Sequence, residues 1–209
     1  MSITLVLLPG MDGTGELFGP FIDALGPAQP VQVLRYPTDR PWGYTELLPW
    51  AAQQLPTDAP YVLLGESFGG PLAWRLAAAA HGHLKGLVLC CTFARNPLPL
   101  LAPLAAVCHA LPWQTARARW LEWLMLGHAA PAQLRQRFRA AIAQVPPAVL
   151  SARARAVLTL PPQPPRLSPQ LPVLSLRARG DRVVPRAATE GMARGLPHAQ
   201  TAVLPGPHG

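Results

Sequence analysis

The sequence predicts an α/β protein with a mostly parallel six-stranded sheet flanked by helices. Two observations predict it: short apolar runs typical of strands alternate with helical segments, and the first five runs lack the polar alternation of a half-exposed strand. The runs span Ile3–Leu8, Val31–Tyr36, Tyr61–Gly65, Gly86–Cys91, Val173–Arg177 and Thr201–Leu204. A chain of 209 residues can bury one sizeable core, so we expect a single domain over residues 1–209.

Helical segments justify the parallel arrangement, because parallel strands need crossover connections. The helical patterns that separate the runs cover Leu17–Leu25, Tyr44–Leu55, Phe68–Ala80 and Arg186–Leu196. A strand–helix–strand order implies right-handed crossovers that place helices over the sheet.

The interval 96–171 interrupts this alternation and predicts a helical lid inserted into the domain. It has no convincing strand pattern, and its helical patterns span Thr115–Leu126, Pro131–Gln144 and Ala148–Leu158. A cluster of apolar side chains within it predicts the lining of a pocket beneath the lid, with Trp120 and Trp123 as candidate substrate-binding residues. The cluster comprises Trp113, Trp120, Trp123, Leu124, Met125 and Leu126. The alternative is that these residues form the core of the insertion itself.

The charge balance is basic, with a net charge of +8, but it does not describe a nucleic-acid site. The basic residues are almost all arginines, scattered among alanine, proline and leucine, which is typical of compositional bias. No helix-turn-helix, zinc or RNA-binding signature accompanies them. We therefore expect no nucleic-acid partner, although the arginines of the middle third leave a basic lid surface open as an alternative.

Other features of the composition indicate a cytoplasmic protein without metal or cofactor. Cys90 and Cys91 are adjacent in an apolar run, where cysteine acts as a small hydrophobe, and no Cys/His spacing fits zinc. The first residues lack the basic region of a signal peptide. The longest apolar stretch, Pro97 to Trp113, is too short and too rich in proline to be an integral membrane segment.

The strongest chemical signal is Gly65-Glu66-Ser67-Phe68-Gly69, which directly follows the third run. A Gly-x-Ser-x-Gly turn between a strand and a helix is a nucleophile elbow, which holds the serine hydroxyl out of the backbone for attack on a carbonyl. Ser67 is therefore the candidate nucleophile.

A glycine-rich loop, Leu8-Pro9-Gly10-Met11-Asp12-Gly13-Thr14-Gly15, follows the first run. It can bring backbone N–H groups close to a substrate, so Met11 and Phe68 are the candidate oxyanion donors, with Gly10 and Asp12 as further substrate-binding residues. A dinucleotide-binding loop is the alternative. Its glycine spacing differs, however, and no acidic residue closes the second run.

Two further strand ends supply a candidate acid and base. Asp181 follows the fifth run and His208 follows the sixth, which gives the chain order Ser…Asp…His. His208 would accept the proton of Ser67, and Asp181 would fix the histidine tautomer. The alternative for Asp181 is a turn or N-cap aspartate.

Together these four motifs resemble the α/β-hydrolase family over Leu5 to His208, and in particular its small bacterial carboxylesterase-like members with a helical lid. The resemblance implies a serine hydrolase that cleaves a small-molecule carboxylic ester or thioester through an acyl-enzyme intermediate. An acyltransferase would use the same residues. A serine nucleophile argues against the dehalogenase-like members, which use aspartate.

Two departures from the family pattern suggest another class of function. The family's usual first two strands have no counterpart, and the final helix expected after the histidine is not in the sequence. We expect apolar surface of the fifth and sixth strands to be exposed or covered by a partner, for which a homodimer is one candidate. A catalytically impaired protein that binds a ligand or partner is therefore the alternative to an enzyme.

Overall fold

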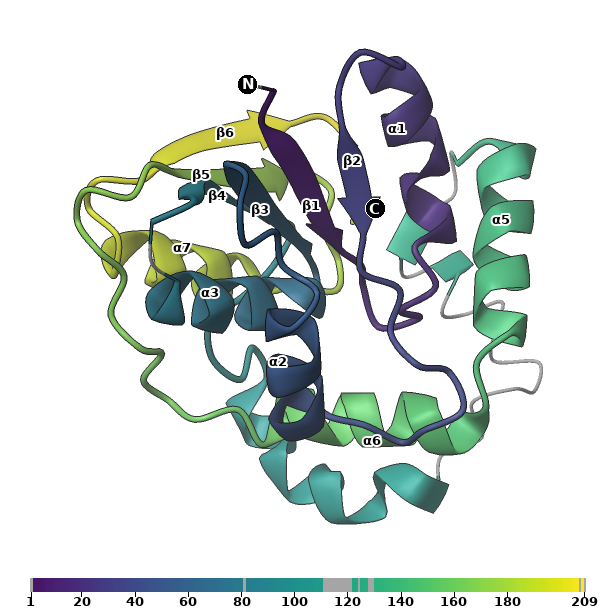
Figure 1. The fold of residues 1–209 in the computed structure, drawn as a ribbon. Helices are drawn as coiled ribbons and strands as arrows, with labels where there is room; N and C mark the ends of the chain where they lie inside the picture. Colours follow the sequence, from purple (N-terminus) through teal and green to yellow (C-terminus); the bar gives the residue numbers. More distant parts are fainter. Residues whose placement is uncertain are drawn as a thin grey trace.

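The computed structural model describes residues 2–80, 82–110, 122–123, 125–127, 130–206 and 208. Their strands form one six-stranded sheet of order β2-β1-β3-β4-β5-β6, and every neighbouring pair is parallel (Figure 1). The strands are β1 (Thr4–Leu8), β2 (Val31–Val33), β3 (Tyr61–Glu66), β4 (Leu84–Cys90), β5 (Val173–Ala178) and β6 (Gln200–Leu204). The predicted α/β class is confirmed. Strand order reverses around β1, so a crevice is expected at the carboxyl ends of β1 and β3.

Helices α2, α3 and α7 pack on one face of this sheet. The helices are η1 (Glu16–Phe18), α1 (Gly19–Leu25), α2 (Tyr44–Ala52), α3 (Gly69–Ala79), η2 (Pro99–Ala110), α5 (Ala132–Ala143), α6 (Pro147–Leu158) and α7 (Arg186–Arg194). Leu47 of α2, Leu72 of α3 and Met192 of α7 are buried with Val6 and Leu63 of the sheet in the main core. This face holds the helix that follows the elbow.

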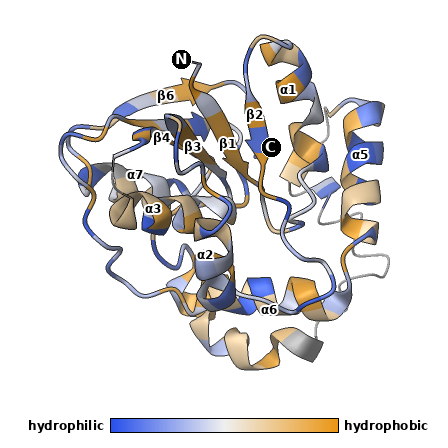
Figure 2. Cartoon of the chain, in the orientation of Figure 1, coloured by the Kyte–Doolittle hydropathy of each residue, from blue (hydrophilic) through white to orange (hydrophobic). Residues whose placement is uncertain are grey.

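The opposite face is covered less completely. Leu7 and Leu64 are buried there with Phe18, and Ile22 of α1 packs against them. The edge strand β6 is only partly covered, since its residues Val203 and Leu204 are 45% and 50% exposed. Figure 2 shows the apolar colouring of the central strands. Burial on both faces was expected for the first five strands, but this is wrong for β2, whose three residues are all half-buried at the side of the sheet.

Strand β2 is also shorter than the sequence run suggested. It ends at Val33, and the Tyr36 N–H donates to the Gly13 carbonyl over 2.8 Å. The predicted continuation to Tyr36 is wrong because the chain turns there toward the loop that follows β1. A strand that bends in this way supports the loop instead of extending the sheet.

The residues between β4 and β5, called here the β4–β5 segment (91–172), contain η2, α5 and α6 and no strand among those described. Figure 1 shows α6 below α2 and α5 beside α1. The segment has a small core of its own, comprising Leu126, Phe138, Ile142, Val145, Val149 and Leu150. Two expected helices are present with slightly shifted ends, whereas Thr115–Leu126 falls largely outside the described residues. The division into domain and lid stays a prediction.

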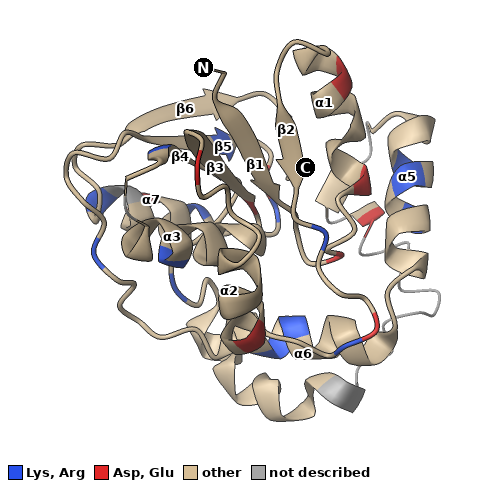
Figure 3. Cartoon of the chain, in the orientation of Figure 1, with Lys and Arg blue, Asp and Glu red and all other residues tan. Residues whose placement is uncertain are grey.

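Charged groups are spread over several elements, as Figure 3 shows. In the β4–β5 segment Glu122 is almost fully buried, and it pairs with Arg139 at 2.5 Å and Arg135 at 3.5 Å. Part of the arginine concentration in the middle third therefore serves the packing of this segment. The described helices include none with the length and apolar character needed to cross a bilayer.

Candidate active site

Ser67 lies in a strained turn between β3 and α3. Its φ of +48° is in the left-handed region, which is unfavourable for a residue with a side chain. The backbone around it is held from β4: the Ser67 N–H donates to the Cys90 carbonyl over 3.0 Å, and the Thr92 hydroxyl donates to the Ser67 carbonyl. The turn thus has the conformation expected of a nucleophile elbow.

The glycines after Ser67 let the chain pass very close to its neighbours. A Cβ on Gly69 would overlap the carbonyl oxygen of Leu8, and one on Gly70 would overlap the Thr92 side chain. A Cβ on Gly65 would lie 2.7 Å from that of Ala73. The motif glycines are therefore required by packing between β1, β3 and α3, and this packing fixes the direction of the serine side chain.

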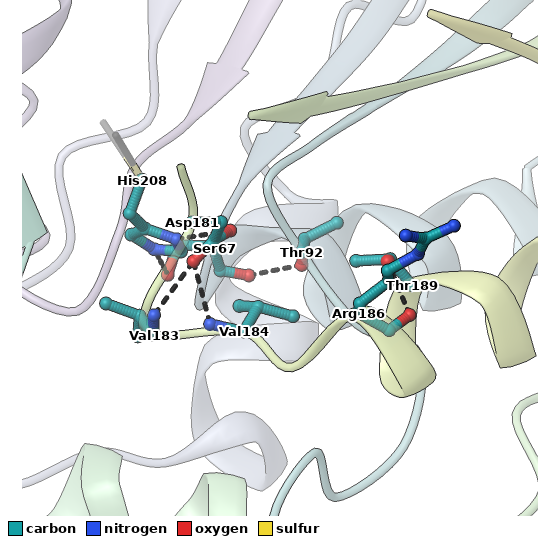
Figure 4. Close-up of polar contacts among 8 residues, drawn as sticks. All are labelled: Ser67, Thr92, Asp181, Val183, Val184, Arg186, Thr189 and His208. Carbon is teal, nitrogen blue, oxygen red and sulfur yellow. Dashed lines mark hydrogen bonds and ion pairs between the residues drawn. The ribbon is translucent and has the colours of Figure 1, made fainter. Parts of the chain in front are cut away.

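Asp181, His208 and Ser67 form one hydrogen-bonded row (Figure 4). His208 Nδ1 lies 2.9 Å from Asp181 Oδ2, and His208 Nε2 lies 2.8 Å from Ser67 Oγ. A carboxylate only accepts hydrogen bonds, so Nδ1 carries the proton and Nε2 is left to accept from the serine hydroxyl. The structure therefore brings together the three residues that the sequence placed on different strand ends.

Asp181 and His208 are held in this row by further hydrogen bonds. The Val183 and Val184 N–H groups both donate to Asp181 Oδ1 over 2.9 Å, which leaves Oδ2 for the histidine (Figure 4). The backbone N–H of His208 donates to the backbone carbonyl of Met125 over 3.1 Å. The imidazole is fully buried although β6, which precedes it, is largely exposed. The β4–β5 segment therefore provides the anchor for the histidine.

The environment of the row shifts two pKa values. Burial by itself lowers the pKa of His208, but the hydrogen bond and charge of Asp181, with smaller effects from Glu66 and Cys91, raise it above its usual value overall. Burial of the Glu66 carboxyl group, assisted by Asp12, raises the pKa of Glu66 to about 7, while His208 and the Gly10 N–H act in the opposite direction.

The loop after β1 is fixed mainly through its carbonyl groups. The Tyr36 hydroxyl donates to the Pro9 carbonyl over 3.0 Å. Arg153 of α6 donates to the Met11 and Asp12 carbonyls over 2.9 and 2.7 Å. Asp12 is buried, and its Oδ2 accepts from the Thr14 N–H and hydroxyl over 2.9 and 2.5 Å. The carboxylate thus organises the loop, and its contact with a substrate stays a prediction.

Phe68, the second candidate oxyanion donor, is held by aromatic neighbours. Its ring stacks on Tyr44 at 4.5 Å and meets Tyr36 edge-on at 6.0 Å. The Tyr44 hydroxyl donates to the Phe68 carbonyl over 3.0 Å. The Tyr44 hydrogen bond fixes the Phe68–Gly69 peptide, and the Thr92 hydroxyl on the Ser67 carbonyl fixes the Ser67–Phe68 peptide, which carries the Phe68 N–H.

The predicted pocket lining is only partly described. Trp120, Trp113 and Leu124 lie outside the described residues. The guanidinium of Arg182, next to Asp181, lies 4.9 Å from the centre of the Trp123 ring. Trp123 is therefore close to the loop after β5 that carries Asp181. Leu126 is buried in the core of the β4–β5 segment, which was the alternative for this cluster.

A cavity of about 920 Å³ opens between α2, η2 and α6. The described residues that line it include Tyr44, Leu48 and Ala156. Ser67, Asp181 and His208 are not among these described lining residues. Tyr44 lines the cavity and also stacks on Phe68, the residue after the candidate nucleophile.

Sequence reasoning missed Thr92, Tyr36, Tyr44 and Arg153 as supports of the site. Each acts through a backbone carbonyl of a distant segment, and such contacts leave no local sequence pattern. Glu66 offered a signal that was not used, because an acidic residue inside the elbow motif must lie close to the nucleophile. In the described part of the chain, no three His, Cys, Asp or Glu side chains gather as metal ligands.

The fold and the row at Ser67 define an α/β hydrolase. The chain belongs to the family described as serine aminopeptidase, S33, whose model matches residues 46–206. The predicted α/β-hydrolase resemblance is thereby confirmed, and the chain is an enzyme of this class.

One curated relative matches part of the chain. Phytyl ester synthase 1, chloroplastic, from Arabidopsis thaliana is 38% identical over 112 residues, which cover 48% of this chain and 16% of that protein. The chain thus spans only a small part of the length of this relative.

Solved structures match nearly the whole chain. The enol-lactonase from Burkholderia xenovorans LB400 has a TM-score of 0.82 at 18% identity, covering 100% of this chain and 85% of that one. A structure from work on carboxylesterases of Nitrososphaera gargenis has a TM-score of 0.77 at 14% identity, covering 99% and 83%. A hydrolase from Pseudomonas aeruginosa PA01 has a TM-score of 0.76 at 21% identity, with the same coverage. Identities this low establish the fold alone.

Proposed function

We propose that this protein is a serine hydrolase that cleaves a small carboxylic ester or thioester through an acyl-enzyme intermediate. The observation that carries the proposal is the continuous row of hydrogen bonds from Asp181 through His208 to Ser67. Such a row is the arrangement that activates a serine hydroxyl at neutral pH.

In the proposed acylation, Ser67 Oγ attacks the substrate carbonyl carbon while its proton moves to His208 Nε2. The N–H groups of Met11 and Phe68 stabilise the oxyanion that forms. The tetrahedral intermediate then collapses, and the bond to the alcohol or thiol breaks. His208 gives its proton to that leaving group, and an acyl ester remains on Ser67.

Deacylation repeats these steps with water as the nucleophile. His208 takes a proton from the water, and the resulting tetrahedral intermediate releases Ser67 with the proton returned to its oxygen. One water is consumed and one carboxylic acid is formed for each ester cleaved. Asp181 holds the tautomer of His208 throughout and stabilises the transient imidazolium.

Turnover of p-nitrophenyl esters and of acyl thioesters of increasing chain length tests this proposal. We expect Ser67→Ala to lower kcat by about 10⁴-fold or more. The matched control Ser168→Ala, in an exposed loop, should keep wild-type turnover. A folded Ser67→Ala variant that retained turnover would overturn the proposal. A folded wild-type protein without turnover would favour the ligand-binding alternative.

Acyl transfer to an alcohol is a second candidate. It is supported by the similarity to phytyl ester synthase 1, although that match covers 16% of the relative. The same acyl-Ser67 intermediate would be attacked by an alcohol in place of water. Added long-chain alcohols should then divert product from carboxylic acid to a new ester, whereas a hydrolase would keep releasing acid.

The absence of a nucleic-acid partner and the cytoplasmic location stay predictions from the sequence.

A further inference from the structure

Arg153 is a buried cation in an unusual place. It lies on α6, in the β4–β5 segment, and is 0% exposed. Placing a guanidinium in the interior costs on the order of several kcal/mol unless hydrogen bonds compensate it. A residue whose only task was to fill volume would be apolar, so the arginine calls for a more specific reason.

The hydrogen bonds of Arg153 all go to backbone carbonyls of two loops. Nη1 donates to Met11 over 2.9 Å and to Asp12 over 2.7 Å, and Nη2 donates to Pro37 over 2.9 Å. These loops follow β1 and β2, about 140 and 116 residues away in the sequence. One side chain thus joins α6 to the loop that carries a candidate oxyanion donor.

The surroundings of the guanidinium are shaped to receive it. Its carbon lies 5.4 Å from the centre of the Tyr36 ring, and the Tyr36 hydroxyl holds the Pro9 carbonyl of the same loop. A Cβ at Gly13 would come within 2.6 Å of Nη1, and Gly13 has φ of +69°. The glycine therefore gives the loop its left-handed turn and leaves room for the arginine.

The contact at Met11 relates this packing to the chemistry. Met11 supplies the proposed oxyanion N–H, and its own carbonyl is the group that Arg153 holds. With the carbonyls of Met11 and Asp12 fixed, the two peptides that follow the Met11 α-carbon cannot rotate without breaking hydrogen bonds of a buried charge. The Met11 N–H belongs to the preceding Gly10–Met11 peptide, which is joined to this fixed part of the loop at the same α-carbon. Oxyanion stabilisation depends on donors that are already aimed before the reaction.

We propose that Arg153 is a positioning residue, which aims the Met11 N–H at the reacting carbonyl by clamping the next two carbonyls of the loop from the β4–β5 segment. The inference rests on the proposed function and extends it, because it makes the oxyanion site depend on α6. Arg153 itself touches no reacting atom in this account.

The test compares Arg153→Met, Arg153→Lys and Arg153→Ala with the matched control Arg155→Ala, whose side chain is exposed on the same helix. Active-site titration first gives the fraction of folded, acylatable enzyme, so that kcat is expressed per active site. We expect kcat of Arg153→Met and Arg153→Ala to fall about 10²-fold, the scale of losing one oxyanion donor, with KM within a few-fold. Arg153→Lys should lie in between, and Arg155→Ala should match the wild type.

Two further readouts separate positioning from a structural role. A trifluoromethyl ketone, which forms a tetrahedral adduct with an oxyanion, should lose affinity by the same factor as kcat. Guanidinium added to Arg153→Ala should restore part of kcat and should not affect Arg155→Ala. A structural role alone would lower the melting temperature and the titrated fraction of active enzyme. It would leave kcat per active site and the affinity for the ketone unchanged.

Wild-type kcat and wild-type ketone affinity in folded Arg153→Met or Arg153→Ala would overturn the inference while leaving the proposed function in place. A wild-type protein without esterase or thioesterase turnover would overturn the proposed function, and this inference with it. Should Arg153→Ala fail to fold, Arg153→Met, which keeps most of the volume, and Arg153→Lys, which keeps the charge, give the same comparison.

Discussion

The two halves of the candidate active site are built in different ways. On the β1 and β3 side, the elbow is held by close packing around glycines, with Gly69 against the Leu8 carbonyl. On the β5 and β6 side, Asp181 and His208 are held by hydrogen bonds in the loops beyond the strand ends. The elbow should therefore be sensitive to added volume, and the pair of Asp181 and His208 to a lost hydrogen-bond donor or acceptor.

Burial follows the same division. Strand β3 is largely buried, whereas β6 is largely exposed, yet His208 after β6 is fully buried. His208 is held by ring hydrogen bonds to Asp181 and Ser67 and by the backbone hydrogen bond to Met125. His208 is thus as fully buried as the packed elbow, and hydrogen bonds hold it in place. Its position depends on Met125 of the β4–β5 segment.

The largest effect is expected from Gly69→Ala, which adds one carbon to the packed half. The new Cβ would overlap the backbone of Leu8 and Pro9, which cannot move aside as a side chain could. We expect a loss of about 3 kcal/mol or more in the free energy of unfolding, and turnover below detection. Chemical denaturation and esterase assays measure both.

Gly86→Ala is the matched control, because it adds the same carbon at a glycine of strand β4, where there is room for it. The nearest atom to its Cβ would be the Pro172 carbonyl oxygen at 3.5 Å, an ordinary contact. We expect a change within about 1 kcal/mol. Equal stability of the Gly69 and Gly86 variants would show that close packing does not hold the elbow.

Asp181→Asn tests the hydrogen-bonded half. The amide oxygen can still accept from Val183 and Val184, but the amide nitrogen cannot accept the Nδ1–H of His208. We expect kcat to fall by about 10³- to 10⁴-fold, with a melting temperature close to that of the wild type. A large loss of stability with wild-type turnover per folded molecule would contradict this role, because Asp181 would then support the fold and not orient His208.

Glu66→Gln tests the acidic residue of the elbow, which is half-buried. An acid whose pKa is raised on folding, here from 4.5 to about 7, binds its proton more tightly in the folded state. The contribution of this group to stability is therefore greatest below pH 4.5 and is lost as the pH rises to about 7. The substituted amide is never charged. The free energy of unfolding of the variant should therefore be about 1–3 kcal/mol higher than that of the wild type at pH 8.

Urea denaturation between pH 5 and pH 8 measures this difference. Asp58→Asn, which makes the matching acid-to-amide change at an exposed position outside the elbow, provides the control. A Glu66→Gln variant that was less stable than the wild type at pH 8 would contradict the raised pKa.

The smallest effect concerns the pH dependence of kcat/KM. Only neutral His208 can accept the proton of Ser67, and its pKa is raised, so activity should fall on the acid side with a midpoint above 6.5. Asp181→Asn removes the main group that raises the pKa and leaves the burial that lowers it. The residual activity of that variant should therefore persist to lower pH. An unchanged midpoint would argue that Asp181 does not set the charge of His208.

The sequence was sufficient to predict the sheet, the elbow and the partners of Ser67, because these depend on local and strongly constrained signals. A strand run that ends in Gly-x-Ser-x-Gly allows few conformations, and strand ends of a parallel sheet meet at one edge. The strand limits were less predictable. Val31–Tyr36 reads as one apolar run, but Tyr36 bonds to Gly13 and leaves the sheet.

The β4–β5 segment was much harder to predict. Its apolar stretch forms η2 with Leu100 92% exposed, although a run of that composition suggests burial. Arg153 and the exposed Arg155 stand in the repeat Ala-Arg-Ala-Arg-Ala, where local sequence cannot say which one is buried. The answer depends on the Met11 and Asp12 carbonyls about 140 residues away, and such pairings appear only in the folded chain.

Labelling with a fluorophosphonate tests the central claim, that Ser67 is a nucleophile activated by His208, most directly. Intact mass and peptide mapping should show one adduct per chain, located on Ser67. Ser67→Ala should take up no label, and His208→Ala should react at least about 100-fold more slowly. A folded wild-type protein that stays unlabelled, or a label that persists in Ser67→Ala, would contradict the claim.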